Sequence, residues 1–173
     1  MPDTLKINAI RRAIGQLTIS IGVQQIREAI SDFSDVEGNF NTFYKPLLGL
    51  PVTQLDERYY FTSLENWKKI MDTINPILKN FPWESERFDC DKRAFLVTAL
   101  TAMLFEVNTV RPIYCDVYRV GDGQFAFAHY ANVIVDSNGS AWLWDVDEDG
   151  LFTKITAQNP IINNKRYYLR AVK

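Results

Sequence analysis

Hydrophobic positions change their spacing near residue 106, from a helical period before it to strand-like alternation after it. The stretch TSLENWKKIMDTI predicts an amphipathic helix, with capping-box spacing between Thr62 and Glu65 and with Pro76 expected to bend or end it. Its inward stripe consists of Leu64, Trp67, Ile70, Met71 and Ile74. Residues 91–106 lack glycine and proline and are apolar around nearly the whole circumference, which predicts a central buried helix.

Residues 1–58 combine two patterns. Helical spacing appears in two stretches, which end at Leu17 and at Phe33, whereas residues 17–23 alternate like a strand. Glycines and prolines interrupt residues 34–56, which indicates a loop. We expect a mostly helical N-terminal extension with one short extended segment.

The second half of the chain alternates between apolar and polar residues. The runs RPIYCDVYRV, QFAFAHYANVIV, AWLWDV and RYYLRAV, with GDG, DSNGS and DEDG between them, predict an antiparallel sheet. We expect one face of the second run to pack on the central helix, the face with Phe125, Phe127, His129, Ala131, Val133 and Val135. The chain is thus predicted to be a single α+β domain, residues 1–173, with a core at 59–173, in which N-terminal helices and a buried central helix pack on an antiparallel β-sheet.

Charge and the length of apolar runs exclude two classes of partner. The net charge is −2 and the lysines and arginines are scattered, so the basic surface of a nucleic-acid-binding protein is not expected. No apolar run approaches the roughly 18 residues needed to cross a bilayer, and the N-terminus lacks the features of a signal peptide. Two cysteines do not make a disulfide framework, so we expect free thiols and a cytoplasmic location. Cys115 shares a strand face with Ile113 and Val117 and is expected to be buried and structural.

Cys90 stands at the beginning of the predicted central helix. The helix dipole and the unpaired backbone N–H groups there stabilise a thiolate, and the backbone N–H of Cys90 is a natural donor to an oxyanion beside the sulfur. Asp89 and Asp91 oppose this effect, because their charges disfavour a further anion. Cys90 therefore needs a base.

His129 is the single histidine of the chain and the candidate base, with a buried structural histidine as the alternative. Asp145 is the candidate carboxylate to orient its ring. With a two-residue turn between the two strands, residue 132 pairs with Asp145, which then points away from His129. With a three-residue turn and a left-handed Gly139, residue 131 pairs with Asp145, which then reaches His129. Both turns fit the sequence; we favour the second, because the first crowds His129 with tryptophans.

The segments FDCDKRAFLVTAL and HYANVIVDSNGSAWLWDVD together resemble the transglutaminase-like branch of papain-type cysteine enzymes. The resemblance covers residues 59–147, including the helix and loop that lead into the cysteine in small bacterial and phage proteins of this type. It implies that Cys90 is the nucleophile, His129 the base and Asp145 the orienting acid. Trp83 is the candidate side-chain donor to the oxyanion. The implied activity is hydrolysis or acyl transfer at amide or isopeptide bonds of a peptide or protein substrate, through a thioester and without a cofactor.

Arg93 and Tyr130 depart from the pattern of that family. They leave open a second hypothesis, a catalytically inactive relative that serves as a binding or structural protein, for example a phage accessory or virion component. Residues 1–58 would then dock on a protein partner.

The segment DVDEDG has the opening spacing of a calcium loop, at Asp145, Asp147, Asp149 and Gly150. Thr156 occupies the position of the bidentate glutamate, so a solvated acidic turn is the preferred interpretation. One histidine and two distant cysteines do not form a zinc-ligand pair. We expect no metal.

Overall fold

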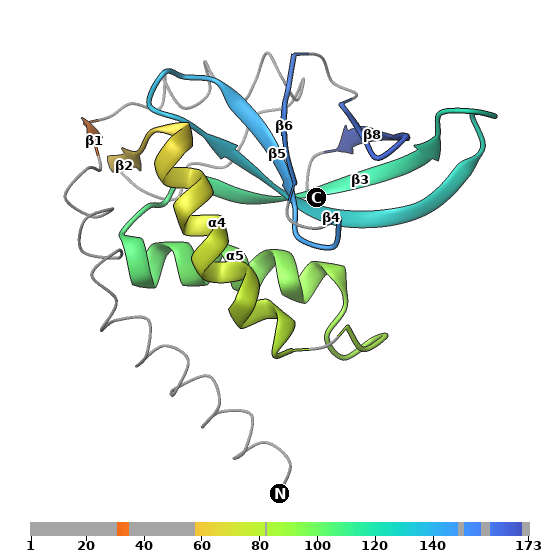
Figure 1. The fold of residues 1–173 in the computed structure, drawn as a ribbon, viewed down its shortest axis with the longest axis horizontal. Helices are drawn as coiled ribbons and strands as arrows, with labels where there is room; N and C mark the ends of the chain where they lie inside the picture. Colours follow the sequence, from red (N-terminus) through yellow and green to blue (C-terminus); the bar gives the residue numbers. More distant parts are fainter. Residues whose placement is uncertain (1–30, 35–57, 82, 149–150, 157–159, 171–173) are drawn as a thin grey trace, which may run out of the picture.

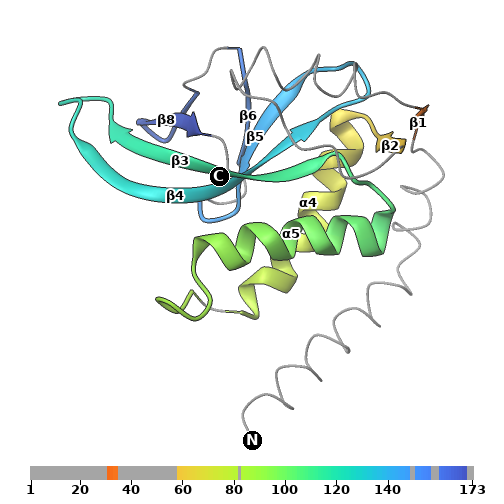
Figure 2. The same ribbon diagram turned by 180° about the vertical axis from the view of Figure 1, so that it is seen from behind.

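The computed structural model describes residues 31–34, 58–81, 83–148, 151–156 and 160–170 (Figure 1). In chain order its elements are β1 (Ser31–Ser34), β2 (Arg58–Phe61), α4 (Leu64–Lys79), α5 (Cys90–Phe105), β3 (Val110–Arg119), β4 (Phe125–Val135), β5 (Ala141–Asp145), β6 (Leu151–Lys154), β7 (Ile161–Ile162) and β8 (Lys165–Arg170). Helices α4 and α5 lie on one side of a six-stranded antiparallel sheet with the order β6-β5-β4-β3-β8-β7 (Figures 1 and 2). The fold is α+β, as the sequence predicts.

Strand β1 pairs with β2 in a separate two-stranded sheet, with Ser31 opposite Phe61. The sequence predicts helical spacing up to Phe33. This prediction is wrong for the last residues of that stretch, because Phe33 lies in a strand opposite Tyr59. The other predictions for the N-terminal extension, in residues 1–30 and 35–57, lie outside the described residues.

Helix α4 begins one residue later than the capping-box spacing predicts. Ser63 is the N-cap, and its side-chain oxygen accepts a hydrogen bond from the backbone N–H of Asn66 at 3.2 Å. Thr62 instead accepts a hydrogen bond from the side-chain amide of Asn66 at 2.8 Å. Both threonine and serine can cap a helix, so the spacing alone could not separate them.

Pro76 lies inside α4, so of the two outcomes expected from the sequence, a bend or an end, the end of the helix at Pro76 is wrong. The helix continues to Lys79, because Ile77 and Leu78 are buried in the core shared by the two helices. Their burial outweighs the backbone hydrogen bond that a proline removes.

Helix α5 begins at Cys90, as predicted, with Asp89 as its N-cap. One face of the helix is buried and contributes Ala94, Val97, Leu100, Leu104 and Phe105 to the core. The opposite face is exposed, with Phe95 at 51%. The prediction of a helix buried all round is therefore wrong: α5 covers the sheet with one face only.

The sheet separates two hydrophobic cores. The core on the helix side includes Ile134 and Trp144, together with apolar residues of α4 and α5. The other core includes Ala131, Val133, Val135, Cys115, Leu143 and Tyr167. The side-chain amide of Asn132 donates a hydrogen bond to the carbonyl of Ala94 at 3.0 Å, so the even-numbered residues of β4 face α5. The expectation that the face of His129 packs on α5 is wrong, because the apolar odd-numbered face packs in the other core and the face with Asn132 meets the helix.

The β4–β5 hairpin adopts the register that we favour from the sequence. Asn132 lies opposite Trp144, and this register places residue 131 opposite Asp145. Gly139 has a φ of 74°, in the left-handed region that the three-residue turn requires. The register puts the side chain of Asp145 on the same face as that of His129.

A carboxylate at the beginning of the turn explains why the three-residue form is adopted. Asp136 accepts hydrogen bonds through one oxygen from the backbone N–H groups of Asn138 and Ser140, both at 2.9 Å. Its other oxygen accepts a hydrogen bond from the indole N–H of Trp142 at 2.9 Å. The buried Asp136 therefore holds the loop backbone through one oxygen and the side chain of Trp142 through the other.

Candidate active site

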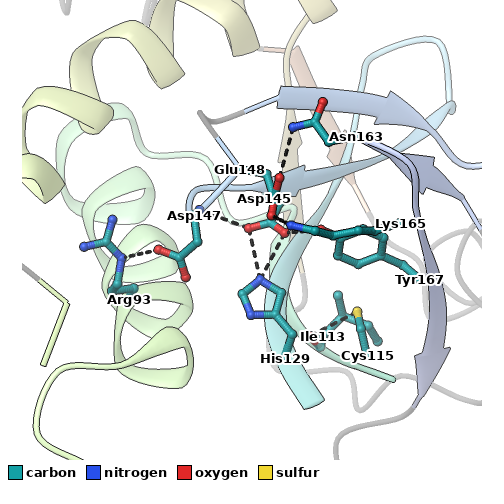
Figure 3. Close-up of polar contacts among 10 residues, drawn as sticks. All are labelled: Arg93, Ile113, Cys115, His129, Asp145, Asp147, Glu148, Asn163, Lys165 and Tyr167. Atoms are coloured by element: carbon teal, nitrogen blue, oxygen red, sulfur yellow. Dashed lines mark hydrogen bonds and ion pairs between the residues drawn. The ribbon is translucent and has the colours of Figure 1, made fainter. Parts of the chain in front are cut away.

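His129 and Asp145 form a buried pair in the interior of the curved sheet (Figure 3). Nε2 of His129 lies 3.0 Å from each carboxylate oxygen of Asp145. The two residues are 6% and 0% exposed, respectively. Because Nε2 is engaged by Asp145, Nδ1 is the ring nitrogen left for a second partner.

Asp145 accepts hydrogen bonds from two further donors, which hold its orientation. The hydroxyl of Tyr167 on β8 donates to Oδ2 at 2.8 Å, and the backbone N–H of Asp147 donates to Oδ1 at 3.0 Å. Sequence analysis missed Tyr167, although the alternation of RYYLRAV places it with Leu169 on one face of the strand. Nothing in the sequence indicates which carboxylate its hydroxyl meets.

The pKa values of the pair move apart, as expected for an ion pair. Burial lowers the pKa of His129, but its interactions with Asp145 and Cys90 outweigh this effect and raise the pKa from 6.5 to about 10. Burial raises the pKa of Asp145, but the hydrogen bond with His129 and then that from Tyr167 outweigh it, so the pKa falls below its usual value. His129 is therefore an imidazolium paired with a carboxylate at neutral pH.

Cys90 and His129 line the same pocket, which has a volume of about 460 Å³. The other lining residues are Trp83, Phe127, Ala128, Asp147 and Glu148. Cys90 is partly exposed, and its interaction with His129 is one cause of the raised pKa of the imidazole. The structure thus brings together the three candidate residues of the sequence analysis. His129 lies between the other two, because it shares a pocket with Cys90 and binds Asp145.

One lysine forms ion pairs with both acidic neighbours of Cys90. Nζ of Lys92 lies 2.9 Å from Asp89 and 3.1 Å from Asp91. The pKa of Asp89 falls to about 2 because of hydrogen bonding to Asp91 and Lys92. The repulsion that the two aspartates would exert on a thiolate is therefore offset locally by a cation.

Cys115 lies directly opposite His129 in the β3–β4 ladder and is fully buried. Burial, followed by the nearby charge of Asp145, raises the pKa of its thiol well above the usual value. Cys90 and Cys115 are both free cysteines. Cys115 is a buried structural residue, as predicted.

His129, Asp145 and Asp147 also offer donor atoms within 4.8 Å of one another, which is close enough to hold a metal ion. These atoms already have partners in the protein, because Asp145 binds His129 and Asp147 pairs with Arg93. A metal would have to replace these interactions. Both oxygens of Asp145 contact His129, and Asp149 and Gly150 of the calcium-loop pattern lie outside the described residues.

Comparison with protein-family models finds no match, and comparison with curated proteins finds none. Among solved structures, the chain is similar to one described as "PSL1a-E64 complex", with a TM-score of 0.50 and 17% sequence identity over 79% of this chain. The match covers 49% of that structure, so the chain spans about half its length. At this identity the similarity concerns the fold alone. In the described part of the chain, none of the helices has the length and apolar character needed to cross a membrane.

Proposed function

We propose that this protein is a cysteine-dependent hydrolase or acyltransferase that acts on amide or isopeptide bonds of a peptide or protein substrate. The observation that carries the proposal is that His129, which forms a buried ion pair with Asp145, lines one pocket together with Cys90 at the N-terminus of α5. The finer fold assignment, a transglutaminase-like core, rests on the sequence resemblance. It agrees with a helix that begins at the cysteine and precedes an antiparallel sheet with the histidine and the aspartate.

In the first step the thiolate of Cys90 attacks the carbonyl carbon of the scissile bond. A C–S bond forms and the carbonyl π electrons move to oxygen. The imidazolium of His129 gives its proton to the leaving nitrogen, the C–N bond breaks, and a thioester remains. No cofactor takes part.

Formation of the thioester also prepares the second step. The interaction with Cys90 helps to raise the pKa of His129, and acylation of the sulfur removes this interaction. The pKa of the imidazole then falls, so that His129 can accept a proton from the water or amine that attacks the thioester. Asp145 keeps the ring oriented in both steps.

Two donors are candidates to stabilise the oxyanion. The backbone N–H of Cys90 is at the N-terminus of α5, where the first N–H groups lack intrahelical partners. The indole of Trp83, which lines the pocket and is 58% exposed, is the candidate side-chain donor.

Alkylation of the native protein with iodoacetamide, followed by peptide mass analysis, tests the proposal. We expect Cys90 to be alkylated in the native protein, and His129→Ala to slow the reaction about 100-fold or more. The buried Cys115 is an internal control and should react only after unfolding. E64, which the description of the structural neighbour names, is a second probe for Cys90. Equal rates in wild type and His129→Ala would contradict the proposal.

A peptide-cleavage assay and a fluorescent-amine incorporation assay, run on the same protein, then separate hydrolysis from transamidation. If Cys90 is unreactive in the folded protein, the second hypothesis applies: a non-catalytic binding or structural protein, such as a phage accessory or virion component, with residues 1–58 as the part that docks on a partner. A cytoplasmic location fits both hypotheses, the enzyme and the non-catalytic protein, because both cysteines are free.

A further inference from the structure

An ion pair between the buried Arg93 and the more exposed Asp147 connects the helix that carries Cys90 to the turn that follows Asp145. Nε of Arg93 lies 2.8 Å from Oδ1 of Asp147, and the two side chains are 10% and 25% exposed (Figure 3). Arg93 follows Cys90 by three residues on α5, about one helical turn. Asp147 follows Asp145 by two residues. The pair therefore joins the two segments that contribute the thiol and the carboxylate of the candidate site.

Arg93 also binds the end of the other helix. Its Nη1 donates a hydrogen bond to the backbone carbonyl of Phe81 at 2.9 Å and lies 3.5 Å from that of Leu78. A guanidinium is suited to this position, because its planar donors can reach several acceptors in fixed directions. The side chain therefore holds α4, α5 and the turn after β5 in one arrangement.

Asp147 transmits this arrangement to the candidate site. Its side chain is fixed by Arg93, and its backbone N–H donates to Oδ1 of Asp145 at 3.0 Å. Asp145 in turn binds His129. A continuous series of contacts thus runs from Arg93 through Asp147 and Asp145 to the imidazole. The neighbouring Glu148 is engaged separately, by Lys165.

We propose that Arg93 and Asp147 are positioning residues, which set the location of Cys90 relative to the His129–Asp145 pair. The consequence for catalysis rests on the proposed function. The effect on the geometry does not rest on the proposed function, because it concerns only how Arg93 and Asp147 hold the two segments in place.

The test compares Arg93→Met, Asp147→Asn and the double variant in the full-length protein. The rate of Cys90 alkylation by iodoacetamide at pH 6 should fall about 10- to 100-fold in each single variant, as small displacements of reacting groups do. The double variant should be no slower than the slower single variant, because one ion pair is lost in all three. Arg93→Lys should be intermediate, since an ammonium can reach Asp147 but cannot also bind the carbonyl of Phe81 in the same way.

A titration of His129 followed by NMR separates positioning from a simple effect of charge. Arg93→Met removes a positive charge near the imidazole, so an effect of charge alone would raise the pKa of His129. Positioning predicts the opposite, a lower pKa than in wild type, because the ring loses its optimal contacts with Cys90 and Asp145. His129 is the only histidine of the chain, so its signal is unambiguous.

Arg87→Met is the matched control, because Arg87 forms an exposed ion pair with Glu84 in the loop that precedes α5. Cys90 in this variant should be alkylated at the wild-type rate. Far-UV circular dichroism and melting temperature confirm folding of every variant, and if Arg93→Met does not fold, Arg93→Lys and Asp147→Asn carry the test. Wild-type alkylation rates and an unchanged His129 titration in these folded variants would overturn the proposal. An unreactive Cys90 in wild type contradicts the proposed function instead, and the His129 titration still decides on positioning.

Discussion

Both carboxylate oxygens of Asp145 lie 3.0 Å from Nε2 of His129, in a position where Asp145 is fully buried. A buried carboxylate is stable only with compensating donors, and here these are the imidazolium, the Tyr167 hydroxyl and the backbone N–H of Asp147. The pair therefore depends on the surrounding sheet, and the sheet fixes which ring nitrogen remains for Cys90.

Asp145→Asn should preserve the fold and reduce turnover by about 10³- to 10⁴-fold, because an amide cannot stabilise the imidazolium and favours the wrong tautomer. The alkylation rate of Cys90 should fall with it. Asp116→Asn is the matched control, since Asp116 forms a surface ion pair with Arg170 on the same sheet. A variant Asp145→Asn with wild-type activity would show that the orienting acid lies elsewhere.

Tyr167→Phe should lower the free energy of unfolding by about 1–2 kcal/mol, because Asp145 loses a buried hydroxyl donor. Chemical denaturation of the variant measures this change. Tyr168→Phe is the control, because Tyr168 lies on the opposite face of β8 and packs edge-on against Tyr118. Equal destabilisation by both substitutions would argue against a specific role for the Tyr167 hydroxyl.

The stability of the fold should depend on pH through the His129–Asp145 pair. The pKa of His129 is raised from 6.5 to about 10, so its contribution is complete below pH 6.5 and is lost as the pH rises through about 10. The pKa of Asp145 is lowered, so its contribution is present above 3.8 and is lost as the pH falls toward the native pKa.

Denaturation of wild type and His129→Gln at several pH values tests this dependence. The difference between the two unfolding free energies should be largest between about pH 4 and pH 6.5, should shrink as the pH rises above 6.5, and should have lost the His129 contribution above about pH 10. A difference that is constant across this range would mean that the charge of His129 does not stabilise the fold.

Gly139→Ala should lower the free energy of unfolding by about 1–2 kcal/mol, because the φ of 74° lies in the left-handed region. Gly121→Ala is the control: a Cβ there meets nothing within 4 Å, and it should change the stability little. If Gly139→Ala also lowers the alkylation rate of Cys90, the hairpin turn contributes to the placement of Asp145.

The sequence was sufficient to predict the local features of the site. Cys90 directly precedes a run without glycine, which predicts a thiol at the beginning of α5. The one histidine of the chain lies in an alternating strand, which leaves one candidate base. The position of Asp145 follows from the length of one turn, which the left-handed Gly139 allows. These inferences succeed because each depends on neighbouring residues or on one hairpin.

Contacts between distant segments could not be predicted in the same way. Tyr167 meets Asp145 across 22 positions, and Arg93 meets Asp147 across the interface of helix and turn. The face of β4 that packs on α5 was also predicted wrongly, because Asn132, a polar residue, is on the helix side and the odd-numbered face is apolar as well. Such choices are decided by packing of the whole domain rather than by local period.

The titration midpoint of His129, measured by NMR on protein with ¹⁵N-labelled histidine, tests the central claim most directly. The account predicts a pKa of about 10 in wild type, with lower values in Cys90→Ala and in Asp145→Asn, because both partners stabilise the imidazolium. A pKa close to 6.5 that neither substitution changes would contradict it, because His129 would then be linked to neither the thiol nor the carboxylate.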